Sequence, residues 1–109
     1  MKKVAVFGLA LTGTAVARAL VGRGYEVVLS DDSINDAHRS LARELSSPIL
    51  EVGSSAAIQA FLTGVDTLLP APGVPPHHPV IRAAEDLSIR IRTEIDVAYE
   101  WEQARVGGP

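Results

Sequence analysis

The chain contains no cysteine. This excludes disulfide bonds, thiolate zinc sites and a cysteine nucleophile, and it fits a reducing compartment such as the cytoplasm. Aromatic side chains are also scarce, at 5% of the residues, although hydrophobic residues make up 47%. Because small aliphatic residues dominate this fraction, the composition favours a parallel sheet covered by helices. The 109 residues are enough for one domain of ordinary size.

Positive charge is in short supply as well, with 10 lysine and arginine residues against 13 acidic ones. Nucleic-acid binding requires a basic surface, so we expect no nucleic-acid partner. No apolar run approaches the ~20 residues that span a bilayer. The start MKKVAVFG has the lysines and apolar residues of a signal peptide, but Gly8, Thr12 and Gly13 interrupt the apolar stretch. We therefore expect a cytoplasmic protein without a membrane partner.

Strand-like and helix-like segments alternate along the whole chain. Strands are expected at residues 3–7, 26–30, 48–52, 66–69 and 89–91, and helices at 12–22, 36–45, 56–62, 79–87 and 95–104. This pattern predicts an α/β fold, a Rossmann-like three-layer sandwich whose five-stranded parallel sheet has the order 3-2-1-4-5 and helices on both faces. We interpret residues 1–109 as a single domain, with 106–109 as the start of a linker or an artificial chain end.

The turn Gly8-Leu9-Ala10-Leu11-Thr12-Gly13 joins the first strand to the first helix. A glycine-rich turn there lets backbone N–H groups approach an anion, and the helix N-terminus adds unpaired donors, so the turn indicates a phosphate site. Ala10 adds a methyl group where a dinucleotide fingerprint has glycine. The alternative is a tight turn that binds nothing. The Thr12 hydroxyl is expected either to cap the helix or to donate to a phosphate oxygen.

Asp31 and Asp32 follow the second strand. An acid in this position, about 20 residues after the glycine turn, commonly receives a sugar hydroxyl or a base N–H group. We favour a ligand role for Asp31 and a surface position for Asp32. The alternative is a solvated turn in which Asp32 or Ser33 helps to cap the next helix. Carboxylates also disfavour a 2′-phosphate, which argues against an NADP-type cofactor.

A proline-rich loop, Pro70 to Pro76, follows the fourth expected strand, and its one glycine, Gly73, is free to take positive φ or to let a ligand approach. The strand order predicts that this loop meets the glycine turn at a crevice. The alternative is a turn that only begins the next helix. His77 and His78 point apart as neighbours and make a poor metal pair, although either could contact a ligand phosphate. We expect no metal site and no catalytic residue in this chain.

Four segments together resemble a known family: VAVFGLALTG, LSDD, APGVPPHHP and IRTEIDVAYE. They resemble the N-terminal domain of the Mur ligases, most closely the MurD-like branch, across nearly the whole chain. The resemblance implies a domain that binds the UDP part of UDP-N-acetylmuramoyl-L-alanine in a peptidoglycan-synthesising enzyme. Carried over by position, the substrate-binding residues are Leu11, Thr12 and Gly13 near the diphosphate, Asp31, Asp32 and Ser33 near the uracil and ribose, and Gly73 at the uridine.

The resemblance also implies an ATP- and Mg²⁺-dependent ligase that adds D-glutamate, with a central ATP-binding domain and a C-terminal domain as partners. The ATP loop of the family, G-T-x-G-K-[ST], does not occur in this sequence, so we expect no cofactor in the chain and no activity from it alone. The sequence departs from the family at Ala10 for glycine, Ala71 for serine, and Asp32-Ser33 for threonine-arginine. Two rivals remain: an NAD-binding module of an oxidoreductase, and an interaction domain with an empty crevice.

Overall fold

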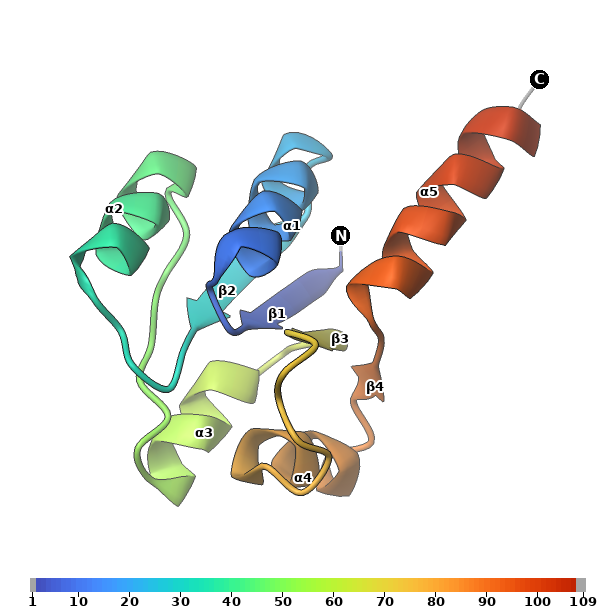
Figure 1. Ribbon diagram of the computed structural model, residues 1–109. Helices are drawn as coiled ribbons and strands as arrows, with labels where there is room; N and C mark the ends of the chain where they lie inside the picture. The colour runs from blue at the N-terminus through green and yellow to red at the C-terminus, as the bar shows by residue number, and fades with distance from the viewer. Residues whose placement is uncertain (1, 108–109) are drawn as a thin grey trace.

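The computed structural model describes residues 2–107, apart from the side chains of residues 95, 98, 99 and 104–107. Strands and helices follow one another largely as expected, except that no strand separates the second and third helices (Figure 1). The strands are β1 (Lys3–Phe7), β2 (Glu26–Ser30), β3 (Thr67–Pro70) and β4 (Arg90–Ile91). The helices are α1 (Leu11–Gly22), α2 (Asp36–Leu45), α3 (Ser55–Leu62), α4 (Pro79–Asp86) and α5 (Glu94–Gly107).

The strands form one parallel sheet in the order β2-β1-β3-β4. The expected strand at 48–52 is absent as a strand, because only Ile49 bridges to Leu29 of β2. Two backbone hydrogen bonds, from Leu29 N–H to Pro48 O and from Leu50 N–H to Leu29 O, make this contact. Pro48 has no N–H to donate, which shortens the pairing. The described sheet therefore has four strands rather than five, but the segment lies beside β2 and the expected order is kept.

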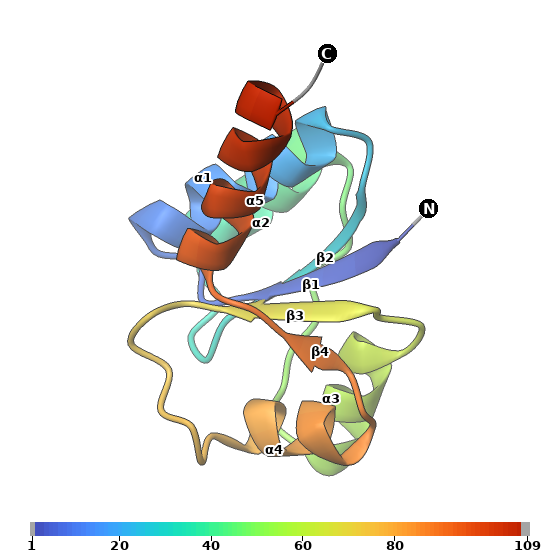
Figure 2. The ribbon, with the colours of Figure 1, turned by 90° about the vertical axis from the view of Figure 1, so that its right-hand side faces the viewer.

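Helices cover both faces of the sheet, as Figure 2 shows: α1, α2 and α5 lie on one face, and α3 and α4 on the other. Alternate side chains of β1 enter opposite cores, since successive strand residues point to opposite faces. Val4 and Val6 contact the first group of helices, and Ala5 and Phe7 the second. The fully buried residues on the second face include Phe61, Leu68 and Val80. This three-layer arrangement confirms the expected fold class.

Several helix boundaries follow from local signals in the sequence. Asn35 caps α2 by accepting from the backbone N–H of His38 at 2.9 Å, and Ser54 caps α3 by accepting from Ala57 N–H at 3.1 Å. Gly24, just beyond α1, adopts the left-handed conformation at φ +87°, as expected for a helix end. The expectation that Thr12 caps α1 was wrong, because the N-cap is Ala10 and no side chain caps that end.

The last helix, α5, begins with reciprocal hydrogen bonds between Thr93 and Asp96. Thr93 N–H donates to the Asp96 carboxylate at 3.1 Å, and Asp96 N–H donates to the Thr93 hydroxyl at 3.0 Å, which is the capping-box pattern. Hydrogen bonding by Thr93 lowers the pKa of Asp96, while burial raises the pKa of Glu94. Of the linker expected at 106–109, residues 106–107 belong to α5, and residues 108–109 lie outside the described residues.

Candidate functional site

Two loops meet at the carboxyl edge of the sheet, where β1 and β3 lie side by side. One is the glycine turn, residues 8–13, which follows β1; the other is the proline loop, residues 70–78, which follows β3. A Cβ atom built on Gly8 would lie only 2.6 Å from the Cβ of Ala71. Ala71 N–H also donates to Phe7 O at 2.8 Å. The expected convergence of the two loops is therefore confirmed.

The glycine turn depends on missing side chains at two positions. Gly8 has φ +99°, a conformation that residues with a Cβ rarely adopt. A Cβ on Gly13 would lie 1.9 Å from the carbonyl oxygen of Gly8, so only glycine lets α1 begin this close to the turn. This close approach is the packing role that the last glycine of such a motif serves. The turn thus places the first residues of α1 directly beside the end of β1.

The first turn of α1 is open at its N-terminus. Neither the N-cap residue Ala10 nor any other described side chain caps it, and no acidic residue lies within it. Leu11 is 90% exposed, and the exposed Thr12 has a hydroxyl without a hydrogen-bond partner among the described residues. Free N–H groups and the positive end of a helix dipole favour an anion at this position.

Asp31, at the end of β2, holds the glycine turn from the side. Its Oδ2 atom accepts a hydrogen bond from Leu9 N–H at 2.7 Å, and its Oδ1 atom accepts one from Ser33 N–H at 2.9 Å. The half-buried carboxylate therefore connects the turn after β1 to the turn after β2. The predicted ligand role of Asp31 remains a prediction, and the structure adds a scaffolding role. Ser33 is exposed at the same turn.

Asp32 reaches across the crevice to His78. The Nε2 atom of His78 lies 3.0 and 3.1 Å from the two carboxylate oxygens of Asp32. The other ring nitrogen of His78, Nδ1, accepts from Val80 N–H at 3.1 Å and so caps α4. The ring centroid also lies 4.9 Å from that of Phe7. Sequence reasoning missed this contact, although the residue before a proline that opens a helix is a natural N-cap.

Gly73 and His77 lie on the exposed part of the proline loop. Nothing lies within 4 Å of a Cβ built on Gly73. Gly73 is not among the described residues with positive φ, so the loop does not use that freedom. The open space around Gly73 is compatible with the approach of a ligand.

A small cavity of about 140 Å³ lies next to the acidic turn after β2. Its lining residues are Asp31, Asp32, Ile34, Glu51, Val52 and Gly53. Three carboxylates therefore border this space. Carboxylates accept hydrogen bonds, so the cavity suits groups that donate them, such as hydroxyls or N–H groups, and disfavours anions.

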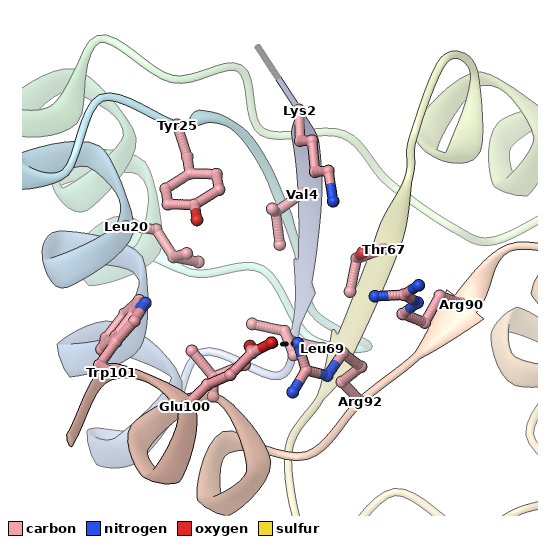
Figure 3. Close-up of a pocket in the computed structure, with 11 residues that line it drawn as sticks. Lys2, Val4, Leu20, Tyr25, Thr67, Leu69, Arg90, Arg92, Glu100 and Trp101 are labelled. Carbon is pink, nitrogen blue, oxygen red and sulfur yellow. Dashed lines mark hydrogen bonds and ion pairs between the residues drawn. The ribbon is translucent and has the colours of Figure 1, made fainter. Parts of the chain in front are cut away.

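A larger cavity, of about 310 Å³, lies at the opposite, amino edge of the sheet (Figure 3). The rings of Tyr25 and Trp101 stand on one side of it, and the guanidinium groups of Arg90 and Arg92 on the other. Arg92 forms an ion pair with Glu100, and Arg23 stacks on Trp101 at 4.0 Å from the ring centroid. This cavity lies where α5 packs against the sheet, and none of the predicted substrate-binding residues lines it.

The structure brings six of the seven predicted substrate-binding residues to the two neighbouring turns after β1 and β2, and it places Gly73 on the facing loop. Within residues 2–107, no cluster of three or more histidine or acidic side chains is placed to hold a metal ion. None of the helices in that range has the length and apolar character that crossing a bilayer requires.

Comparisons with known proteins identify the family. Residues 2–93 match the family described as "Mur ligase MurD-like, N-terminal domain". The UDP-N-acetylmuramoylalanine–D-glutamate ligase of Syntrophus aciditrophicus is 34% identical over 94% of this chain and 23% of its own length. The corresponding ligase of Enterococcus hirae is 30% identical over 98% of this chain and 23% of its own length. The chain thus spans less than a quarter of these relatives.

Among solved structures, the chain is similar to the UDP-N-acetylmuramate–alanine ligase MurC of Thermotoga maritima. The TM-score is 0.75 at 22% identity, over 94% of this chain and 23% of that one, which supports the fold. The sequence match over residues 2–93 goes further than the fold, because it covers both loops of the crevice. The chain belongs to the family of MurD-like Mur ligase N-terminal domains.

Proposed function

We propose that the crevice binds the UDP part of UDP-N-acetylmuramoyl-L-alanine, and that the chain is the substrate-holding part of a ligase that adds D-glutamate to it. The observation that carries this proposal is the open first turn of α1 at the point where the glycine turn and the proline loop meet. A diphosphate is one of the anions that such a turn can bind. The ligases of this name among the relatives support the choice of substrate.

In this proposal, three groups of residues contact different parts of the ligand. Leu11, Thr12 and Gly13 border the diphosphate position at the start of α1. The acidic turn at residues 31–33 offers acceptors to the ribose hydroxyls or to a base N–H group. Gly73, with open space around it, borders the uridine from the other side of the crevice. An oxidoreductase module with bound NAD is less favoured, because the family match is to the Mur ligases.

In the complete enzyme, the contribution of this chain would be positioning. Anchoring the nucleotide end of the substrate would hold its distant carboxylate in reach of a separate catalytic domain, which converts a bimolecular encounter into an oriented one. ATP and Mg²⁺ would belong to that cytoplasmic ligase's central domain. The described residues here offer no metal-holding cluster, and the sequence has no ATP loop, so no catalytic step is assigned to this chain.

Titration calorimetry of the chain with UDP-N-acetylmuramoyl-L-alanine and with NAD tests this function. We expect binding of the UDP-sugar and weaker or no binding of NAD. Thr12→Val should weaken UDP-sugar binding by about 1 kcal/mol, because it removes a hydroxyl that the fold leaves without a partner. Thr63→Val, at the far end of α3, is the matched control and should leave binding unchanged. Tighter binding of NAD would overturn the proposal, and binding of neither ligand would favour an interaction domain.

A further inference from the structure

We propose that His78 is a positioning residue that holds Asp32 in place, and that Asp32 is the carboxylate of this crevice that accepts hydrogen bonds from the ribose or base of the ligand. The inference rests on the proposed function and divides the roles of the two neighbouring acids. Asp31 would hold the scaffold, whereas Asp32, with the aid of His78, would contact the ligand.

Asp31 is already occupied by the protein. Each of its carboxylate oxygens accepts a backbone N–H, from Leu9 at 2.7 Å and from Ser33 at 2.9 Å. Hydrogen bonds of this kind to an ionised group are strong and short. Asp31 keeps about two lone-pair sites and also lines the acidic cavity, but a shift of its side chain toward a ligand would release one or both N–H groups and loosen the glycine turn. Asp31 is therefore better suited to hold the turn than to select a ligand.

His78 is fixed by two contacts that do not involve Asp32. Its Nδ1 atom accepts from Val80 N–H, which leaves the proton of a neutral ring on Nε2, and its ring packs on that of Phe7. The His78 side chain is 14% exposed, whereas that of Asp32 is 64% exposed. Because the histidine is anchored and the acid is exposed, His78 sets the position of Asp32 and not the reverse.

Asp32 retains acceptor capacity after it pairs with His78. An ionised carboxylate has about four lone-pair sites, and a single Nε2–H group uses one or shares two. Asp32 also lines the cavity of about 140 Å³ at the acidic turn. A ligand group in that cavity would meet an acceptor whose orientation the protein has already fixed, which lowers the ordering cost of binding. Adjacent hydroxyls or an N–H group fit this site, and a phosphate does not.

The pair also joins the two sides of the crevice. Asp32 follows β2, and His78 ends the proline loop after β3, with β1 between these strands. A contact across the central strand fixes the spacing between the acidic turn and the proline loop. A change at His78 should therefore alter affinity for the nucleoside part of the ligand without altering the diphosphate position at α1.

The test is a double-mutant cycle measured by titration calorimetry with UDP. His78→Asn keeps a side chain that can cap α4 but is too short to reach Asp32, since asparagine is a favoured N-cap. We expect His78→Asn to weaken UDP binding about fivefold and Asp32→Asn about tenfold. The double variant should bind no more weakly than Asp32→Asn alone, because His78 acts through Asp32. His77→Asn, on the adjacent exposed histidine, should change nothing.

A second readout separates positioning from folding. The ¹⁵N spectrum of the His78 ring should show that, when the ring is neutral, its proton lies on Nε2, and the Nε2 signal should move in Asp32→Asn. Thermal unfolding of His78→Asn should show a lower Tm, because the variant loses the packing of the ring on Phe7, but it should remain a single cooperative transition. Additive losses, or an Nε2 signal that Asp32→Asn does not move, would overturn the inference. If the unaltered chain binds UDP and the variants bind it equally well, only this inference fails; if the unaltered chain does not bind, the proposed function fails.

Discussion

The glycine turn and the proline loop face each other across one crevice, yet the protein fixes them in different ways. The glycine turn is closely packed at two positions without side chains, because Gly8 and Gly13 leave no room for a Cβ. The Asp31 carboxylate also connects this turn to the end of β2. The proline loop is instead restricted by its own side chains, namely its stiff prolines and the anchored ring of His78. The first kind of support fails when atoms are added, whereas the second weakens gradually when atoms are removed. Substitutions on the two sides should therefore differ in how much they lower the free energy of unfolding.

The largest effect is expected from Gly13→Ala. The new Cβ would lie 1.9 Å from the Gly8 carbonyl oxygen, and neither backbone can move without separating α1 from β1. We expect the free energy of unfolding to fall by about 3 kcal/mol or more, measured by urea denaturation. Gly22→Ala, at the other end of α1 with nothing within 4 Å, is the matched control. It should be neutral or slightly stabilising, because alanine favours helix. Equal effects at the two positions would contradict this view of the turn.

Gly8→Ala should have the second largest effect, and it tests the contact between the glycine turn and the proline loop. The added Cβ would lie 2.6 Å from the Cβ of Ala71, and the residue would keep φ +99°. We expect a loss of about 2 kcal/mol, from overpacking and from backbone strain together. In the background of Ala71→Gly the clash is absent, so the further loss on adding Gly8→Ala should shrink to about 1 kcal/mol of strain. An unchanged loss in the two backgrounds would show that the loops do not touch.

Asp31→Asn should have an intermediate effect. An amide oxygen can still accept one of the two N–H groups, but the NH₂ group would face the other. We expect a loss of about 1.5 kcal/mol in the free energy of unfolding, since hydrogen bonds to a charged group are worth more than neutral ones. Amide shifts of Leu9 and Ser33 should report the local change. Asp86→Asn, on an exposed acid at the end of α4, is the control and should cost almost nothing.

Much of the fold follows from the sequence because its signals are local. The boundaries of β1 and β2 and the caps Asn35 and Ser54 are each determined by a few neighbouring residues. The convergence of the two loops also follows, since alternation of strands and helices fixes the strand order. The third expected strand, at residues 48–52, was mispredicted because Pro48 removes a ladder donor and only Ile49 pairs. Helix capping by Thr12 failed because that residue lies inside α1 and Ala10 precedes the helix.

The site was predictable in outline but not in its contacts. The residues of the glycine turn and the acidic turn stand out in the sequence, because a glycine-rich turn after the first strand and an acid about 20 residues later form a known nucleotide-binding pattern. The contact between Asp32 and His78 joins residues 46 positions apart, and no local pattern specifies which of two adjacent histidines turns inward. That choice depends on the ring of Phe7, which lies on β1 and is found only once the sheet is assembled.

The smallest effect is expected on the proline side, from Pro75→Ala. Alanine removes no hydrogen bond, because proline has no N–H and the carbonyl that accepts from His78 N–H remains. The substitution should lower the free energy of unfolding by about 0.5 kcal/mol, because alanine gives the unfolded chain more conformational freedom. This loss stays small because Pro76 restricts the conformation of the residue before it. Differential scanning calorimetry should show a slightly lower Tm, and Pro75→Gly a lower one still, because glycine widens that freedom further. A loss as large as that of Gly13→Ala would mean that the proline ring itself is packed into the crevice, and that the two loops are held in the same way after all.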